Sequence, residues 1–258
     1  MIYAGCDVGS LTAEAVIIRD KKIIAGEIIQ VRAGASASAR QVMEKALEKA
    51  GLGYNDISLC YSTGYGRFSM DFAEKNISEI SCHGMGAHYV DSSIRTIIDI
   101  GGQDCKVIAI DKEGLVLDFV MNDKCAAGTG RSLEILANAI DVDLDKLGPV
   151  SMKSKRPVRI NNKCGIFMEQ EVLWNLYKNK KIKDLALGIN QAVAKRVAIL
   201  AKKMKIRPGI ALTGGVSKNI GVKAALEDIL NINFTKLSLD PQLMGALGAA
   251  IYAMKEYK

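Results

Sequence analysis

Two short segments of the sequence place an aspartate two residues before a glycine, between stretches of apolar residues. The first is Asp7-Val8-Gly9 and the second is Asp99-Ile100-Gly101. Because glycine has no side chain, the backbone N–H groups around it approach a phosphate group closely. An aspartate at the end of a strand suits a hydrated Mg²⁺, since carboxylates and water are ligands that this ion prefers. The two segments therefore predict phosphate and magnesium chemistry.

The surroundings of the two segments repeat as well. The strands expected around the first are residues 2–6, 12–18 and 23–29, and those around the second are residues 96–100, 106–110 and 115–120. One copy alone would be interpreted as an ordinary hairpin turn, but two copies in the same three-strand context favour phosphate-binding loops. A repeat of this length predicts two similar lobes.

A third glycine-rich element follows later in the chain. A short strand at residues 209–212 leads into Thr213-Gly214-Gly215-Val216, and a helix is expected over residues 220–229. Such a junction places backbone amides and a helix N-terminus beside a nucleotide, although the chain has neither the P-loop nor the Rossmann glycine pattern. The residues expected to contact the nucleotide are Gly9, Ser10, Leu11, Thr12, Gly101, Gly102, Gln103, Gly214, Gly215, Val216 and Asn219.

Helices are expected between these elements. Ser36 or Ser38 would cap a helix that ends at Gly51, and Asp184 would cap a longer helix that runs to about Met204. Their apolar residues recur at helical spacing, which predicts that each buries one face.

Four of the six cysteines have contexts that give them little chemistry. Cys6, Cys60 and Cys105 lie in expected strands among apolar neighbours, where cysteine behaves as a small buried hydrophobe. Cys82 precedes His83, and a single Cys-His pair is weak support for a metal site or a nucleophile.

Cys125 and Cys164 differ from the other four. Both follow the pattern Asn-x-Lys-Cys near the start of an expected helix. A helix N-terminus and a nearby lysine favour the thiolate, which is the form that binds iron or zinc. Two thiolates cannot complete a four-cysteine site, so a twofold dimer would have to supply the other pair.

The three glycine-rich elements, in this order, resemble the actin, Hsp70 and sugar-kinase superfamily. The resemblance covers essentially the whole chain and implies an α/β fold of two ribonuclease-H-like lobes that close on ATP. The D-x-G loops would then contact the phosphates, and the Gly-Gly loop the adenosine. We expect the first lobe to comprise residues 1–94 with a C-terminal helix at 241–258, and the second lobe to comprise residues 95–240.

A closer resemblance is to the activators of 2-hydroxyglutaryl-CoA dehydratase and the ATPase subunits of benzoyl-CoA reductase. The matching segments are residues 123–131 (DKCAAGTGR), 98–104 (IDIGGQD) and 63–67 (TGYGR), Cys82-His83, and Cys164 with Phe167, Glu169 and Glu171. The resemblance implies a homodimer that holds one [4Fe–4S] cluster, with Cys125 and Cys164 of each subunit as ligands. ATP hydrolysis would change the helices around the cluster, which passes one electron to an iron–sulfur dehydratase or reductase.

Four residues are expected to take part in hydrolysis. Asp7 and Asp99 would hold Mg²⁺ through water, and Gln103 and Asp104 lie where the water that attacks the γ-phosphate could be oriented. The expected electron donor is a ferredoxin or a flavodoxin. The residues that depart from the family pattern leave the identity of the activated enzyme open: Ser132, Gly165, Met168 and Gln170.

Composition narrows the class of protein. The chain has 258 residues, of which 49% are hydrophobic and 24% charged, as in ordinary globular proteins. The net charge of +7 suits phosphates or an acidic partner, but aromatic residues are only 5%, which disfavours nucleic-acid binding. No apolar run reaches the ~20 residues that span a bilayer, and Asp7 interrupts the first apolar run, so we expect a cytoplasmic protein with reduced cysteines.

Two other functions fit an ATP-binding fold, namely a sugar or acid kinase and a nucleotide-gated regulator that transfers no electron.

Overall fold

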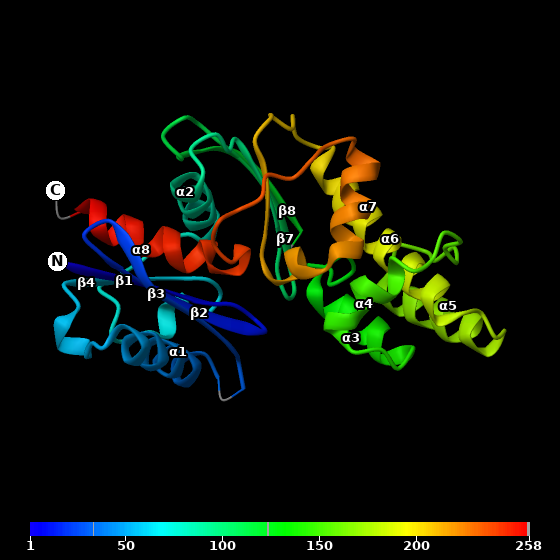
Figure 1. Ribbon diagram of the computed structural model, residues 1–258, viewed down its shortest axis with the longest axis horizontal. Coiled ribbons are helices and arrows are strands. Elements are labelled where there is room, and N and C mark those ends of the chain that lie inside the picture. Colours follow the sequence, from blue (N-terminus) through cyan, green and yellow to red (C-terminus); the bar gives the residue numbers. More distant parts are fainter. Residues whose placement is uncertain (33, 123, 257–258) are drawn as a thin grey trace. The chain divides into compact units, whose positions relative to one another are not determined.

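The computed structural model describes residues 1–32, 34–122 and 124–256, and the chain divides into two compact units (Figure 1). Unit 1 comprises Met1–Ile97, Ile108–Asp118 and Lys236–Lys258, and unit 2 comprises Ile98–Val107 and Phe119–Thr235. Asp123 of the DKCAAGTGR segment and residues 257–258 of the expected last helix lie outside the described residues. The residue ranges expected for the two lobes remain a prediction.

Unit 1 is built on a sheet with the strand order β3-β2-β1-β4-β5. Its strands are β1 (Ile2–Val8), β2 (Thr12–Arg19), β3 (Lys22–Gln30), β4 (Leu59–Thr63) and β5 (Lys75–Asn76). Strand β1 pairs antiparallel with β2 and parallel with β4, so that Asp7 lies between Glu14 on one neighbour and Thr63 on the other.

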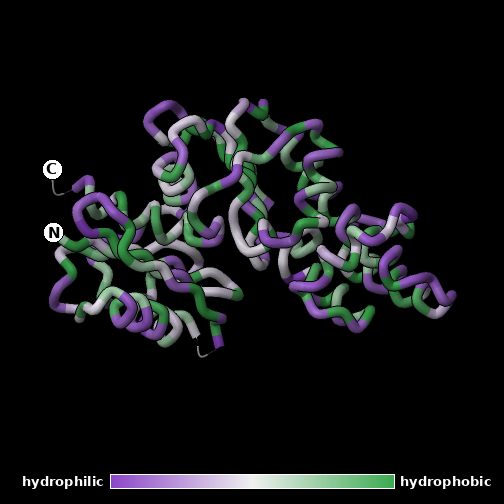
Figure 2. Tube along the Cα trace, in the orientation of Figure 1, coloured by the Kyte–Doolittle hydropathy of each residue, from purple (hydrophilic) through white to green (hydrophobic). Residues whose placement is uncertain are grey.

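Helices cover both faces of this sheet (Figure 1). Helix α1 (Ala35–Ala50) packs on one face, and α2 (Glu79–Val90) and α8 (Met244–Glu256) pack on the other. Because side chains alternate along a strand, Ile17 of β2 faces α1 whereas Val16 and Ile18 face α8. Figure 2 shows that α8 is apolar over most of its length and hydrophilic at its end, as its burial requires.

The sheet that carries the second repeat has the order β8-β7-β6-β9. Its strands are β6 (Thr96–Ile100), β7 (Cys105–Ile110), β8 (Val116–Asn122) and β9 (Ile210–Thr213). The helices of unit 2 are α3 (Gly130–Ala139), α4 (Leu144–Ser151), α5 (Gly165–Tyr177), α6 (Ile182–Ala201) and α7 (Ile220–Leu230). The mixed α/β architecture with two sheets is the fold class expected from the sequence.

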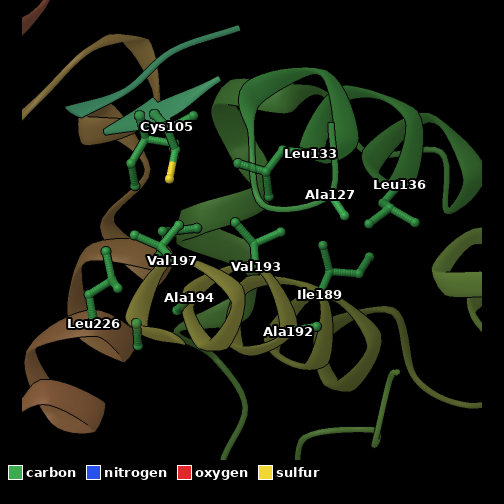
Figure 3. Packing of buried hydrophobic residues seen from close by; sticks show 14 of the residues in the cluster. Cys105, Ala127, Leu133, Leu136, Ile189, Ala192, Val193, Ala194, Val197 and Leu226 are labelled. Atoms are coloured by element: carbon green, nitrogen blue, oxygen red, sulfur yellow. The ribbon is translucent and has the colours of Figure 1, made fainter. Parts of the chain in front are cut away.

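Helix α6 runs through the core of unit 2 (Figure 3). Its residues Ile189, Val193 and Val197 are buried and belong to the same cluster as Leu133 and Leu136 of α3. Each such side chain stabilises the fold by about 1.5–3 kcal/mol when it leaves water. Interiors of this kind are packed as closely as organic crystals, so α3 and α6 interlock through these side chains.

The helix boundaries correct two expectations. Helix α1 begins at Ala35 after Gly34 with no side-chain cap, so neither Ser36 nor Ser38 caps it, although it does end at Gly51 in the left-handed conformation. Helix α6 begins at Ile182 and ends at Ala201, which places Asp184 inside its first turn rather than at its cap. Among the described residues, no helix has the length and the hydropathy to cross a membrane.

Candidate nucleotide site and cysteine centre

Loop 1, which we define as residues 7–12, joins β1 to β2 as a tight hairpin. The Gly9 N–H donates to the Thr12 carbonyl at 2.9 Å, and the Val31 N–H donates to the Leu11 carbonyl at 2.9 Å. Gly9, Ser10, Leu11 and Thr12 are only half-buried, so their polar groups are partly open to a ligand. A turn of accessible amides after a strand-end aspartate suits an oxyanion.

The Asp7 carboxylate is enclosed by residues that are far from it in the sequence. A Cβ on Gly64, which has φ +83°, would overlap Asp7 Oδ1, and a Cβ on Gly245 would overlap Asp7 Oδ2. His83 Nε2 lies 3.9 Å from Asp7 Oδ2. Gly64 of the TGYGR segment and His83 of the Cys82-His83 pair therefore form part of the wall around Asp7.

Glu14 is a buried carboxylate that sequence reasoning missed. It pairs directly with Asp7 across β1 and β2, so both side chains lie on the same face of the sheet. Gln242 Nε2 donates to Glu14 Oε1 and to Thr12 Oγ1, each at 2.9 Å. The signal available in the sequence was its position seven residues after Asp7, which matches the position of Lys106 after Asp99.

Loop 2, which we define as residues 99–104, has the same tight hairpin closure as loop 1. The Gly101 N–H donates to the Asp104 carbonyl at 3.0 Å. Gly101 and Gly102 are half-buried, the Gln103 side chain is exposed, and Asp99 and Asp104 are buried. The expected roles of these residues in binding and hydrolysis remain predictions.

A buried lysine pairs with both aspartates of loop 2. Lys106 Nζ lies 3.2 Å from Asp99 Oδ2 and 2.8 Å from Asp104 Oδ2. The Thr213 hydroxyl donates to Asp99 Oδ1 at 2.8 Å. Buried carboxylates need such partners, because an uncompensated charge away from water is very costly. Both oxygens of Asp99 are thus held in place.

The Gly-Gly loop, residues 213–219, lies directly against loop 2. Gly214 has φ +79°, and a Cβ there would overlap the Ile100 carbonyl oxygen and lie 2.9 Å from Asp99 Oδ1. Gly215 begins a 3₁₀ turn (Gly215–Lys218), and Val216 is buried, so its contact with the nucleotide remains a prediction. The structure therefore brings the second and third glycine-rich elements together within unit 2, whereas loop 1 belongs to unit 1.

Asn219 is held by a buried polar network. Its Oδ1 accepts from the Gly221 and Val222 N–H groups at 2.9 and 3.1 Å, which caps α7, and its Nδ2 donates to Asn190 Oδ1 at 3.1 Å. Asn190 is fully buried on α6 and donates to Ser151 Oγ on α4 at 2.9 Å. The contact of Asn219 with the nucleotide remains a prediction, and its network links the Gly-Gly loop to two core helices.

Loop 2 is also hydrogen-bonded to the helix that follows Cys125. The Gly130 N–H donates to the Gly101 carbonyl at 2.9 Å, and the Arg131 N–H donates to the Gly102 carbonyl at 2.8 Å. Gly130 is the first residue of α3, and a Cβ there would lie 3.2 Å from the Gly101 oxygen. The phosphate loop expected from the sequence is thus in direct backbone contact with the cysteine segment.

Each of the two distinctive cysteines lies close to the start of a helix. Asn122 Nδ2 donates to the Cys125 carbonyl at 2.8 Å in the turn before α3, which begins at Gly130. Cys164 is the N-cap residue of α5, and its carbonyl accepts from the Met168 N–H at 2.9 Å. Helices α3 and α5 pack against each other within unit 2.

Burial separates Cys125 and Cys164 from the remaining cysteines. Both are half-buried, whereas Cys6, Cys60, Cys82 and Cys105 are buried. Burial raises the pKa of the Cys6, Cys60 and Cys82 thiols well above the ordinary value, and that of Cys105 to about 12. These thiols stay protonated near neutral pH and make poor metal ligands.

The donor set fits a metal that needs ligands from more than one chain. In the part of the chain that the structure describes, no group of three or more His, Cys, Asp or Glu residues is arranged to hold a metal ion. Cys125 and Cys164 are both half-buried, and two thiolates are half of a four-thiolate site. Their role as ligands of a cluster shared by two chains remains a prediction.

Comparisons with known proteins identify relatives that align with the whole chain. The chain is 44% identical to the 2-hydroxyisocaproyl-CoA dehydratase activator of Clostridioides difficile over 259 residues, which cover 100% of this chain and 97% of that protein. The crystal structure of component A of (R)-2-hydroxyglutaryl-CoA dehydratase from Acidaminococcus fermentans has a TM-score of 0.95 at 40% identity, with 99% and 98% of the two chains covered.

Two further solved structures bear on the nucleotide and on the fold. The activator of 2-hydroxyisocaproyl-CoA dehydratase from Clostridium difficile, with bound ADPNP, has a TM-score of 0.95 at 43% identity and covers 99% of this chain and 95% of its own. A ROK hexokinase from Thermus thermophilus has a TM-score of 0.56 at 14% identity over 100% of both chains. At this identity the hexokinase match shows a shared fold alone. The expected relation to sugar kinases is thus confirmed for the fold.

The match to a protein family spans nearly the whole chain. Residues 4–253 match the BadF/BadG/BcrA/BcrD ATPase family. This range contains loop 1, loop 2, the Gly-Gly loop and both half-buried cysteines. The chain belongs to the BadF/BadG/BcrA/BcrD ATPase family.

Proposed function

We propose that this chain hydrolyses ATP to drive the transfer of one electron to an iron–sulfur enzyme, either a 2-hydroxyacyl-CoA dehydratase or a related reductase. The electron would leave from a [4Fe–4S] cluster held between two copies of the chain in the cytoplasm. A ferredoxin or a flavodoxin would supply it. The activator names of relatives at 43–44% identity support this choice of partner.

The observation that carries the proposal is the contact between loop 2 and α3. The carbonyls of Gly101 and Gly102 accept the first two amides of the helix that follows Cys125. A shift of loop 2 on hydrolysis would therefore displace the start of α3, since both hydrogen bonds join backbone to backbone. A kinase has no need of such a link between its phosphate loop and a cysteine segment.

Four residues would have the roles in hydrolysis that the sequence predicts for them. Asp7 and Asp99 would hold Mg²⁺ through water, and this ion would supply charge neutralisation at the γ-phosphate. Gln103 is exposed at the tip of loop 2, where its amide could orient a water molecule. The buried Asp104 pairs with Lys106, and through this pairing it would stabilise the conformation of loop 2 that orients the water. The ADPNP-bound relative supports nucleotide binding by this chain.

Cys125 and Cys164 of each copy would hold the cluster. When bound, a [4Fe–4S] cluster supplies a one-electron carrier whose potential depends on charge and hydrogen bonding around its sulfurs. Cys164 caps α5, so the positive end of that helix dipole would favour the additional negative charge of the reduced state. The thiols of the buried cysteines would take no part.

The exposed face of α5 supports assembly next to this centre. Five large apolar side chains of the helix are exposed, and they are Ile166, Phe167, Leu173, Trp174 and Tyr177. A hollow of about 490 Å³ beside them is lined by Asn161, Phe167, Gln170, Glu171 and Trp174. Soluble proteins rarely leave apolar residues together in this way unless another chain covers them. A second copy of the chain, the partner enzyme, or each in turn would cover this face.

Iron content tests the proposal. We expect anaerobically purified protein to be a brown dimer with about four iron and four sulfide per dimer. Cys125→Ser and Cys164→Ser should each lose the colour and the iron, whereas Cys60→Ser, which changes a buried thiol, should keep both. Colourless wild-type protein that still hydrolyses ATP would refute electron transfer and leave a nucleotide-gated regulator as the better interpretation.

A further inference from the structure

The strongest unexplained feature of unit 2 is the burial of the Lys106 ammonium. Lys106 lies on β7, and its side chain is 2% exposed, the largest of the fully buried side chains. Lysine is almost never buried to this extent unless its charge is paired, because the ammonium loses its hydration. Two carboxylates compensate it here, Asp99 at 3.2 Å and Asp104 at 2.8 Å.

These two carboxylates belong to the part of loop 2 that would act on the phosphates. Asp99 Oδ1 accepts from the Thr213 hydroxyl at 2.8 Å, next to the Gly-Gly loop. Asp104 Oδ1 faces the turn of loop 2, since a Cβ on Gly101 would lie 2.5 Å from it. The Lys106 ammonium forms an ion pair with the remaining oxygen of each, so one positive charge faces the carboxylates at both ends of loop 2.

The corresponding position in the first repeat shows that the hairpin itself does not require a lysine. Glu14 lies seven residues after Asp7, as Lys106 lies seven residues after Asp99, and Glu14 is also buried. The same hairpin therefore accepts a buried residue of either sign at this position. The positive charge at Lys106 therefore matches the two carboxylates of loop 2 and is not required by the hairpin.

We propose that Lys106 is a positioning residue for ATP hydrolysis, acting as a fixed internal cation that orients the Asp99 and Asp104 carboxylates. A protein without this ammonium would need a mobile cation between the two carboxylates to keep them in place. Lys106 thus makes loop 2 independent of monovalent cations. The inference rests on the proposed ATP hydrolysis at this site and does not depend on the cluster or on the partner.

The test compares Lys106→Ala with Lys106→Met in ATP hydrolysis assays with tetramethylammonium as the only added monovalent cation. We expect both variants to lose about 100-fold in kcat, the cost of misplacing reacting groups by about 1 Å. Their affinity for ADP, measured by calorimetry, should change much less. Ammonium or methylammonium should restore part of the activity of Lys106→Ala, whose shortened side chain leaves room for the ion. Neither ion should restore Lys106→Met, whose side chain fills that space, and neither should affect the wild type.

Several results would overturn the proposal. One is a kcat within threefold of wild type in Lys106→Ala, and another is a loss of activity in folded Lys106→Ala that neither cation restores. If neither lysine variant folds, Asp104→Asn becomes the deciding variant, since it leaves Lys106 paired with Asp99. Normal hydrolysis by folded Asp104→Asn would then assign Lys106 to the core alone, whereas a comparable loss of kcat would support positioning. Since the assay follows phosphate release without any electron acceptor, a failure of the proposed electron transfer would leave these outcomes unchanged.

Discussion

The hydrogen bond from Gly130 to loop 2 can be removed by a single substitution that leaves every other hydrogen-bond donor of the chain in place. Gly130 is the first residue of α3, where proline is tolerated because the N–H there has no partner within the helix. Thr129, with φ −123° and ψ 174°, already has the extended conformation that proline imposes on the residue before it. Gly130→Pro therefore deletes one donor and keeps the helix. Gly130→Ala adds the same Cβ and keeps the N–H, which makes it the matched control.

The expected effect follows from the value of one hydrogen bond. A backbone hydrogen bond contributes about 1 kcal/mol net, and 1.4 kcal/mol is a factor of ten in an equilibrium constant. Gly130→Pro removes one of the two bonds to loop 2, so the free energy that couples nucleotide to α3 should fall by about 1 kcal/mol. This is a roughly fivefold change, against a typical coupling of about 1–3 kcal/mol. The remaining coupling free energy should be preserved by the hydrogen bond from the Arg131 N–H to the Gly102 carbonyl.

Two assays measure this coupling. In the iron-loaded dimer, the rate at which a chelator removes iron is compared between ADP and a non-hydrolysable ATP analogue, and the ratio of the two rates reports the coupling. In iron-free protein, the fluorescence of Trp174, the only tryptophan of the chain, reports the nucleotide response of α5, which packs on α3. We expect Gly130→Pro to reduce both responses about fivefold and Gly130→Ala to keep them. Equal responses in the two variants would refute the role of this bond, provided that their thermal unfolding is alike.

Three further predictions use other parts of the molecule. In metal-free protein at pH 8, iodoacetamide should modify Cys125 and Cys164 and spare the buried cysteines, as mass spectrometry would show. Because burial raises the pKa of Cys105 to about 12, its thiolate should form only as the pH approaches that value, and modification of Cys105 at pH 8 would contradict the structure. Asn190→Ala should lower the free energy of unfolding by about 1–3 kcal/mol in urea titrations, because it removes the hydrogen bonds of a fully buried side chain to Ser151 and Asn219. Lys195→Ala on the exposed side of α6 should change it little. Gly245→Ala should lower the kcat for ATP hydrolysis about 100-fold, because the new methyl group would displace the Asp7 carboxylate. An unchanged kcat in a folded variant would show that Asp7 has no role in hydrolysis.

The sequence predicted the features that depend on neighbouring residues. Loop 1 and loop 2 follow from short patterns of apolar residues, aspartate and glycine, and their hairpins are confirmed. Cys164 was expected at the start of a helix, and it is the N-cap of α5. Such features are readable because a turn or a helix start is decided by the preferences of a few consecutive residues.

The sequence could not predict the contacts between distant segments. Gly64 and Gly245 meet at Asp7 only because β1, β4 and α8 pack together, and no local pattern records that packing. The start of α1 at Ala35 shows the same limit, since tertiary packing placed the first turn before the serines that could have capped it. Lys106 resembled any strand residue until its ammonium was seen between two carboxylates.

The N-terminus of α3 explains why loop 2, rather than another part of unit 2, would carry the state of the nucleotide to Cys125. The first amides of a helix have no partner within it, and leaving one buried without an acceptor costs about 1–3 kcal/mol. In α3 the amides of Gly130 and Arg131 find their acceptors on loop 2. If hydrolysis moves the Gly101 and Gly102 carbonyls, α3 must either follow them or give up both hydrogen bonds. Following costs less, because the helix shifts as a body against α5 and α6 while each of its hydrogen bonds is kept.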